Sequence, residues 1–327
     1  MRTVGFVISK KENEKRRAIL PGQVNLLKNK QYLFFEQGYG EVLGYTDQQY
    51  IDAGASVVSR DEALSKDIIC DPKIGDALYL ESLKEGQLIF GWVHAVQNKS
   101  VTDILVDNKI SALAWEDMYE SGRHVFWRNN ELAGEAAIMH AFTLFGKLPY
   151  DCKVAIIGKG NIARGAYRIL SALGADIKVY DKKMEQLLRD EISEFDVIVN
   201  GILWDVDRKD HIINREDLLK MKNTSMIVDI SCDRNGAIET SVPTTIENPI
   251  YYCEGVLHYV VDHTPALVSH TVSKTLGDEV VKYLDYIIEN TDLSFNKTLR
   301  NALIIENGNI LDSRINIFQK RKELIES

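Results

Sequence analysis

The sequence has 327 residues, of which 45% are hydrophobic and 27% charged, and its formal net charge is -9. The length exceeds what one hydrophobic core usually organises, so two domains are expected. The acidic balance argues against a nucleic-acid surface. No apolar run approaches the length that spans a bilayer, and the apolar residues 4–8 are too few for a signal peptide. The four cysteines form no CxxC pair and have no metal-ligand spacing, which predicts reduced thiols, no metal site and a cytoplasmic protein.

Short apolar strands alternate with helical segments in the first third of the chain. The strands are predicted at 4–9, 32–38, 55–59, 67–70, 87–93 and 110–115, and the helices at 21–30 and 61–66. Alternation of this kind implies parallel strand pairing in an α/β unit.

A long helix is predicted at 131–148, where small and apolar residues recur at helical spacing before Gly146 and Pro149. We expect it to join the first domain to the second. The second domain is predicted to contain strands at 153–158, 177–181, 196–203 and 225–231 and an amphipathic helix at 161–174. Further helices are predicted at 273–290 and within 294–327.

These elements predict an α/β protein of two domains. Residues 131–272 would form a Rossmann-like dinucleotide-binding domain. A helix that follows the last strand of such a domain often packs back on the domain before it. We therefore expect a discontinuous α/β substrate domain made of residues 1–130 and 273–327.

The turn after the strand at 153–158 matches G-x-G-x-x-A. Gly158 permits the tight turn, Gly160 lets the backbone approach a pyrophosphate, and Ala163 lets the helix pack close to the strand. The helix then begins at Asn161 and Ile162, where its N-terminus offers N–H groups and partial positive charge to phosphates. Together with the flanking strand and helix, this turn predicts a dinucleotide site.

The end of the next strand carries the residues expected to select the cofactor. Asp181 lies 21 residues beyond Gly160, where a carboxylate would hold the ribose 2′-hydroxyl of NAD. Lys182 and Lys183 follow at once and are suited to the 2′-phosphate of NADP. NADPH is favoured slightly, and NADH is the alternative. Only thirteen residues separate Asp181 from Phe195, so this domain is predicted to be shorter than a full Rossmann fold.

Three strand ends of the first domain carry groups suited to reduction of a 2-oxo acid. Arg16, beside Arg17, follows the first strand, Lys73 follows the strand at 67–70, and His94 follows the one at 87–93. Parallel sheets bind ligands beyond the carboxyl ends of their strands. An arginine can bind a carboxylate with two hydrogen bonds, and a lysine or histidine can donate a proton to the group being reduced.

Five segments in this order resemble the alanine dehydrogenase and pyridine nucleotide transhydrogenase family: KENEKRRAILP, CDPKIG, GWVH, GKGNIARGA and VDISCDRNGAIETSVPTT. The resemblance covers nearly the whole chain. It implies that Arg16 binds the substrate carboxylate, that Lys73 contacts the substrate and that His94 is the catalytic histidine. It also implies that Asp233 is a catalytic acidic residue at the cleft between the two domains.

Further segments, among them NGILWDVDRKDHIINREDL and LHYVVDHTP, resemble the branch of this family that condenses pyruvate with the side-chain amine of ornithine by reduction with NADPH. In that case Asp262 and His263 are candidates for holding the α groups of the amino acid. Glu116 is a further candidate. Trp204 and Asp205 are expected to border the nicotinamide.

Other functions are compatible with the same residues. Ammonia in place of ornithine would make the chain an alanine dehydrogenase. The Asp-His-x-Pro segment also resembles the lysine-forming saccharopine dehydrogenases, and lysine would suit the same pocket. A nucleotide-binding regulatory subunit without turnover is the alternative from another class. By analogy with the family, we expect a homo-oligomer that binds small molecules and neither membranes nor nucleic acid.

Overall fold

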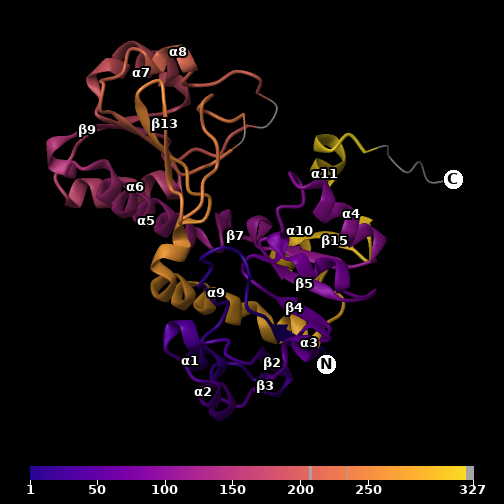
Figure 1. Cartoon of the computed structure of the whole chain (residues 1–327). Coiled ribbons are helices and arrows are strands. Elements are labelled where there is room, and N and C mark those ends of the chain that lie inside the picture. The colour runs from indigo at the N-terminus through magenta and orange to yellow at the C-terminus, as the bar shows by residue number, and fades with distance from the viewer. Residues whose placement is uncertain (206–207, 234, 322–327) are drawn as a thin grey trace. The chain divides into compact units, whose positions relative to one another are not determined.

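The computed structural model describes residues 1–205, 208–233 and 235–321. It divides into two compact units (Figure 1). Unit 1 contains residues 1–126 and 269–327, and unit 2 contains residues 127–268. The boundaries fall at the first residues of two long helices, α5 (Trp127–Phe145) and α9 (Ser269–Glu289). The predicted α/β fold class, with a discontinuous first domain, is confirmed.

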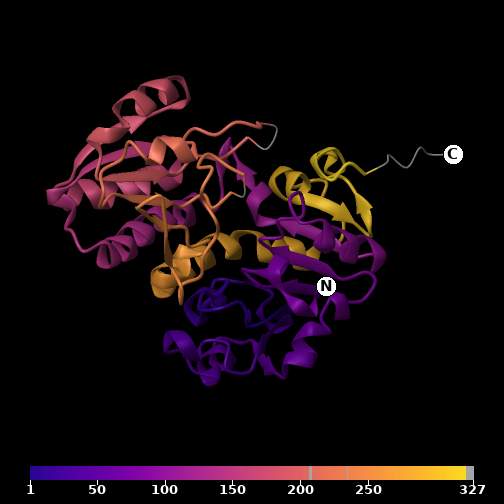
Figure 2. The same cartoon turned by 45° about the horizontal axis from the view of Figure 1, so that its top comes forward.

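Unit 1 is built on an eight-stranded sheet with the order β16-β15-β6-β5-β4-β1-β2-β3. Its strands are β1 (Val4–Phe6), β2 (Leu33–Glu36), β3 (Ser56–Val58), β4 (Ile68–Cys70), β5 (Leu88–Gly91), β6 (Ser111–Ala114), β15 (Leu303–Glu306) and β16 (Asn309–Ile310). The strands from β1 to β6 run parallel, and β15 adds an antiparallel strand beside β6. Figure 2 shows how the C-terminal segment, in yellow, joins the sheet made by the N-terminal part of the chain.

The helices of unit 1 are α1 (Pro21–Val24), α2 (Asp47–Asp52), α3 (Arg60–Leu64), α4 (Lys99–Asp107), α9, α10 (Lys297–Ala302) and α11 (Ser313–Phe318). A two-stranded hairpin, β7 (Tyr119–Glu120) and β8 (Arg123–His124), completes the unit. The parallel strands are three or four residues long. Almost every residue of β1, β4, β5 and β6 is buried. Continuous burial of this kind is expected for parallel strands that are covered on both faces.

A helix was predicted at 21–30, but α1 ends at Val24 and is therefore shorter than expected. Beyond it, the backbone N–H groups of Lys28 and Asn29 donate to the Asp285 carboxylate of α9, and the Asn29 amide donates to Glu289. These contacts satisfy donors that a longer helix would have satisfied internally. Tertiary hydrogen bonds from a residue more than 250 positions away therefore override the local helical pattern.

Unit 2 contains a six-stranded sheet with the order β10-β9-β11-β12-β14-β13. Its elements are β9 (Lys153–Ile157), α6 (Asn161–Ala172), β10 (Asp176–Tyr180), α7 (Glu185–Glu191), β11 (Val197–Asn200), α8 (Arg215–Leu218), β12 (Met226–Asp229), β13 (Ile250–Cys253) and β14 (Val256–Tyr259), together with α5. The chain passes from β9 outward to β10 and then returns to the other side of β9 at β11. Such a reversal creates the crevice in which Rossmann-like domains bind dinucleotides.

Both faces of the unit 2 sheet are covered. Residues of α5 and α6 pack on one face, around Val154, Ile156 and Val199. Residues of α7 and α8 pack on the other face, around Ala155, Ile157 and Ile198. The short α7, with one 3₁₀ turn on either side, connects β10 to β11, which accounts for the few residues that the sequence allows there. No helix of the described ranges combines the length and apolar character needed to cross a membrane.

Candidate active site

Four adjacent strands of unit 1 end at one edge of the sheet. The order of the strands places β1, β4, β5 and β6 side by side, all parallel. Arg16, Lys73, His94 and Glu116 each lie in the segment that follows one of these strands. The sheet therefore carries these four side chains at the edge where open α/β sheets bind ligands.

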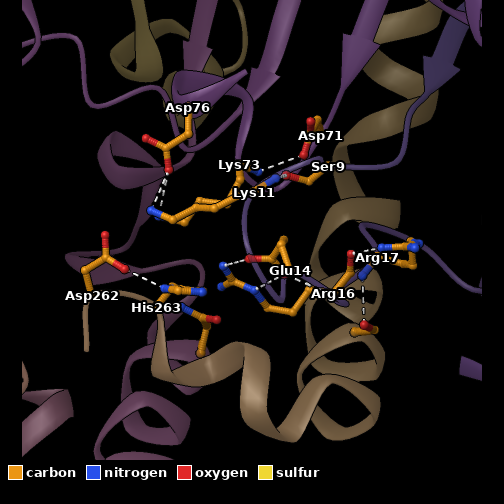
Figure 3. A network of polar contacts seen from close by, with 12 residues as sticks. Ser9, Lys11, Glu14, Arg16, Arg17, Asp71, Lys73, Asp76, Asp262 and His263 are labelled. Carbon is orange, nitrogen blue, oxygen red and sulfur yellow. Dashed lines mark hydrogen bonds and ion pairs between the residues drawn. The ribbon is translucent and has the colours of Figure 1, made fainter. Parts of the chain in front are cut away.

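Arg16 lies in the loop after β1 and is held by Glu14. Its Nε and Nη2 atoms donate to the two Glu14 carboxylate oxygens at 2.8 and 2.5 Å (Figure 3). The guanidinium lies over the Trp92 ring, 5.2 Å from its centroid. Although burial opposes ionisation, the Arg16 charge holds the pKa of Glu14 below its ordinary value. Glu14 thus fixes the orientation of the Arg16 guanidinium through two of its nitrogen atoms.

The neighbouring Arg17 has a different environment. It is buried, its Nε donates to the carbonyl of Tyr39, and its Nη1 donates to the carbonyl of Arg16 at 2.9 Å. The guanidinium also lies 5.3 Å from the centroid of the Tyr39 ring. Bonds to backbone carbonyls and an aromatic ring are typical of a structural arginine, which favours Arg16 as the anion-binding residue.

Lys73 lies in the loop after β4, opposite a carboxylate. Its ammonium is 3.4 Å from Asp76, which also pairs with Lys11 at 2.9 Å (Figure 3). The backbone N–H of Lys73 donates to Asp71, whose other oxygen accepts from the Tyr79 hydroxyl. Burial raises the pKa of Asp71 to about 6. Asp71 thus holds the backbone of the loop, while Asp76 orients the Lys73 side chain.

His94 lies in the loop after β5, in backbone contact with the Lys73 loop. The Gly75 N–H donates to the Trp92 carbonyl at 3.0 Å. A Cβ atom on Gly75 would lie 2.1 Å from the Val93 carbonyl oxygen, so only glycine permits this approach. Glycine at this position therefore sets the spacing between the loops that carry Lys73 and His94.

The His94 side chain is exposed, but the surrounding loops displace much of the bulk water around it. This desolvation lowers the pKa of the imidazole, and the Lys73 ammonium lowers it further, whereas Glu116 opposes the shift. A lowered pKa keeps the imidazole neutral near pH 7. A neutral imidazole can accept a proton from an incoming ammonium group.

In unit 2 the glycine-rich turn fits a dinucleotide. Gly158 has a φ of 109°, in the region that favours glycine, and follows β9 directly. Gly160 is the N-cap of α6, and a Cβ atom there would meet nothing within 4 Å. Asn161 and Ile162 form the first turn of α6, and Ala163 is buried against the end of β11. The backbone at this turn is therefore open to a pyrophosphate at a helix N-terminus.

Asp181 directly follows β10 and is paired with a lysine of the glycine-rich turn. Its carboxylate accepts from Lys159 Nζ at 2.7 Å and from the Lys183 backbone N–H at 3.0 Å. These two contacts hold the pKa of Asp181 below its ordinary value. Lys182 and Lys183 lie in the short 3₁₀ helix that Asp181 caps.

A pocket beside Asp181 is lined by Lys182, Ile202, Trp204, Asp205 and Arg208 among others. The Arg208 guanidinium lies 4.5 Å from the centroid of the Trp204 ring and pairs with Glu185 at 2.8 Å. Trp204 and Asp205 thus share this pocket with Asp181, the residue predicted to lie at the ribose. That they border the nicotinamide stays a prediction.

The remaining predicted residues follow β12 and β14. Burial raises the pKa of Asp233 to about 6, the nearby Asp229 charge adds to the shift, and a hydrogen bond from the backbone of Trp204 opposes it. Asp262 accepts a hydrogen bond from His263 Nδ1 at 2.5 Å. Within the residues that the structure describes, no group of three or more His, Cys, Asp or Glu side chains is arranged to hold a metal.

Several residues of the site were not singled out by the sequence pattern. Glu14, Asp76 and Lys159 each pair with a predicted residue, and Gly75 sets the approach of two loops. The spacing E-x-R in residues 14–16 and the lysine inside G-K-G were visible signals. Nothing local distinguishes Gly75 or Asp76 from ordinary loop residues.

Two α/β units, one with a G-x-G-x-x-A turn at a helix N-terminus, define a dinucleotide-dependent oxidoreductase of two domains. Residues 7–127 match the alanine dehydrogenase/PNT N-terminal domain, and residues 182–313 match the alanine dehydrogenase/PNT C-terminal domain. Residues 117–240 also match the NAD-binding domain of the D-isomer specific 2-hydroxyacid dehydrogenases. The chain belongs to the alanine dehydrogenase/pyridine nucleotide transhydrogenase family, as its motifs predicted.

The chain is similar to two proteins named N(5)-(carboxyethyl)ornithine synthase. It is 32% identical to the one from Clostridium botulinum, over 88% of this chain and 98% of that protein. It is 30% identical to the one from Lactococcus lactis subsp. lactis, over 84% and 93%. Its identity to alanine dehydrogenase 1 of Staphylococcus aureus is 26%, over 97% and 93%.

Two solved structures share the fold. An L-alanine dehydrogenase superposes with a TM-score of 0.84 at 21% identity, covering 97% of this chain and 99% of that one. The transhydrogenase from Sinorhizobium meliloti superposes with a TM-score of 0.78 at 19% identity, covering 94% and 100%.

Proposed function

We propose that the protein catalyses the reductive condensation of pyruvate with the side-chain amine of ornithine, giving N(5)-(carboxyethyl)ornithine. The observation that carries the proposal is the likeness to the synthases, at 30–32% identity over at least 84% of the chain. The likeness to alanine dehydrogenase 1 is lower, at 26%. Arg16, Lys73 and His94 at adjacent strand ends suit an oxo acid substrate.

In this mechanism Arg16 binds the pyruvate carboxylate, while Glu14 holds its Nε and Nη2 atoms. Lys73 donates a hydrogen bond to the oxo group and stabilises negative charge that develops on the oxygen. The neutral imidazole of His94 accepts a proton from the ornithine ammonium. The free amine then attacks the oxo carbon.

His94 next gives its proton to the alkoxide oxygen, then takes a second proton from the attached nitrogen and passes it to the hydroxyl, so that water leaves and a protonated imine remains. A reduced nicotinamide cofactor, held by Gly158, Gly160 and the first turn of α6, would supply the hydride that reduces the imine carbon. The product is a secondary amine, and one reduced cofactor is oxidised for each pyruvate consumed. Asp262, His263 and Asp233 are proposed to hold the charged α groups of ornithine and the protonated amine.

An assay of pyruvate and reduced cofactor with a panel of amines tests the function. Ornithine is expected to drive cofactor oxidation at least tenfold faster than lysine or ammonia, and the product mass is expected to match a carboxyethyl adduct. Faster turnover with ammonia would indicate an alanine dehydrogenase, and faster turnover with lysine would indicate a lysine-using enzyme. Cofactor binding without oxidation in the presence of any amine would overturn the proposal.

We also propose that the enzyme prefers NADPH. Lys159 neutralises the carboxylate of Asp181, and Lys182 and Lys183 add two further ammonium groups at the same strand end. A 2′-phosphate can replace the Asp181 carboxylate as the partner of Lys159, whereas a ribose 2′-hydroxyl brings no charge for that ammonium group.

Lys159→Ala is therefore expected to raise KM for NADPH by roughly tenfold, the effect of one charge-assisted hydrogen bond, while KM for NADH changes less than threefold. Steady-state kinetics with both cofactors measures the ratio. Lys147→Ala is the matched control, because Lys147 pairs with Asp196 at the opposite, amino-terminal end of the sheet. Equal effects of Lys159→Ala on the two cofactors would contradict the assignment.

A further inference from the structure

The backbone of His94 has an unusual conformation. Its φ is 52°, in the left-handed region that side chains other than glycine rarely adopt. The residue follows β5 after only two intervening positions, so its backbone decides where the imidazole points from the strand end. A conformation of this kind persists only where neighbouring groups hold it in place.

Glu116 is the group that holds it. One carboxylate oxygen accepts from the His94 N–H at 2.5 Å, and the other accepts from the Val93 N–H at 3.2 Å. Glu116 lies in a 3₁₀ helix, Trp115–Asp117, which begins directly after β6. Since β6 pairs with β5, the carboxylate reaches the His94 loop from the neighbouring strand.

On the other side of the His94 loop lies the Lys73 loop. Gly75 donates its N–H to the Trp92 carbonyl and packs against the Val93 carbonyl. The segment from Trp92 to His94 is thus held from both sides. Its carbonyl groups contact Gly75 in the loop after β4, and its N–H groups donate to Glu116 in the segment after β6. Removal of the carboxylate would leave two adjacent N–H groups without their acceptor and free the loop to leave the left-handed conformation.

We propose that Glu116 is a positioning residue, which holds the Val93–His94 amides so that the His94 imidazole is presented at the carboxyl ends of β4 and β5. The role of the imidazole in proton transfer rests on the proposed function, but the conformational role of Glu116 does not. This assignment replaces the expectation that Glu116 holds the α groups of the amino acid, because both of its oxygens accept hydrogen bonds from the backbone.

Kinetics of Glu116→Gln tests the assignment. Glutamine keeps the length of the side chain but presents an amide NH₂ to one of the two N–H groups. We expect kcat to fall 10- to 100-fold while KM for pyruvate changes less than threefold. In the His94→Gln background the same substitution is expected to change kcat less than threefold, because Glu116 acts through His94. If the fold-losses in kcat of the two single variants multiplied in the double variant, the proposal would be overturned.

Asp117→Asn is the matched control. Asp117 lies on the same 3₁₀ helix and pairs with Arg314 at 2.7 Å. Its substitution removes a neighbouring carboxylate without touching the amides of Val93 and His94. We expect kcat to stay within twofold of the unmodified protein. A loss in Asp117→Asn as large as that in Glu116→Gln would point to general damage of the helix and would also overturn the proposal.

Carbethoxylation of His94 by diethyl pyrocarbonate gives a readout that does not depend on turnover. The reagent attacks neutral imidazole, and peptide mass mapping follows His94 against the exposed His270. The charged groups that act on His94 are Glu116, Lys73, Asp76 and Lys11. Loss of the Glu116 charge is expected to shift the pH midpoint of His94 modification downward and to change its rate at least threefold, with His270 unaffected.

An unchanged rate and midpoint at His94 in Glu116→Gln would overturn the proposal even in a protein that turned over no amine. Conversely, a changed His94 profile in a protein without activity would preserve the positioning role and reject only the proposed function. The two failures are therefore distinguishable.

Discussion

His94→Gln is expected to lower kcat for the condensation by about 10²- to 10⁴-fold, the usual contribution of a positioned general acid and base. Glutamine retains a hydrogen-bonding side chain of similar size but cannot carry a proton between the amine and the departing oxygen. The affinity for the reduced cofactor is expected to stay within threefold, because the glycine-rich turn belongs to the other unit. Stopped-flow single turnovers and cofactor titration by fluorescence measure the two quantities.

The proton-accepting role of His94 also predicts how kcat/KM depends on pH. His94 must be neutral to accept the proton of ornithine, so kcat/KM is expected to fall as pH drops through the pKa of the imidazole. That pKa lies below its ordinary value because of desolvation and Lys73. The acidic limb should therefore lie below pH ~6.5 and vanish in His94→Gln.

His140→Gln is the control for loss of an imidazole as such. His140 lies on α5, where its Nδ1 atom is 3.0 Å from the Tyr259 hydroxyl. Its replacement is expected to leave kcat within twofold. A retained acidic limb in His94→Gln, or a loss of kcat below tenfold, would show that another group carries the proton.

The sequence predicted those features of the fold and site that local patterns specify. Every strand predicted at 4–9, 67–70, 87–93 and 110–115 exists, because short apolar runs between turn residues are typical of buried parallel strands. Residues that follow parallel strands then lie at the same edge of the sheet, at the carboxyl ends of the strands, whatever the conformation of the loops. The glycine-rich turn was recognisable for a similar reason, since its residues act within one βαβ unit.

The partners of those residues depend on contacts between loops distant in sequence. The sequence indicated Glu116 only as a candidate for substrate binding, because its hydrogen bonds to the His94 loop depend on the pairing of β6 with β5 and on the φ of His94. Lys159 is part of the glycine-rich turn, but its pairing with Asp181 requires β10 to lie beside β9. The truncation of α1 by Asp285 is of the same kind. Such contacts between distant residues cannot be predicted from the local periodicity of the sequence.

Glu14→Gln is expected to destabilise unit 1 by about 3–5 kcal/mol, the usual cost of leaving a buried charge without its partner. The side chains of Arg16 and Glu14 are 3% and 0% exposed, and the carboxylate binds both Nε and Nη2. Glutamine offers one acceptor oxygen and turns an NH₂ group toward the guanidinium. Native-state hydrogen exchange at the amides of β1 and β4 measures the free energy of opening for this unit alone.

The companion variants separate stability from binding. Glu14→Met with Arg16→Met removes both charges, so its free energy of opening is expected within about 1 kcal/mol of the unmodified protein. Activity with pyruvate should nevertheless fall by more than 10²-fold, because two charged hydrogen bonds are lost, at about 1.5–3 kcal/mol each. Glu85→Gln, which breaks the exposed pair with Lys109, is the stability control and is expected to cost about 0–1 kcal/mol.

The effect of Glu14→Gln should also depend on pH. Glu14 has a pKa below its ordinary value in the folded protein, so its ion pair contributes stability above the unfolded pKa of about 4.3. This contribution is lost as pH falls through the lower, folded pKa. The difference in opening free energy between the unmodified protein and Glu14→Gln is thus expected to be largest near neutral pH and to shrink below pH ~4. A difference that stayed constant to low pH would mean that shape, rather than charge, makes Glu14 the partner of Arg16.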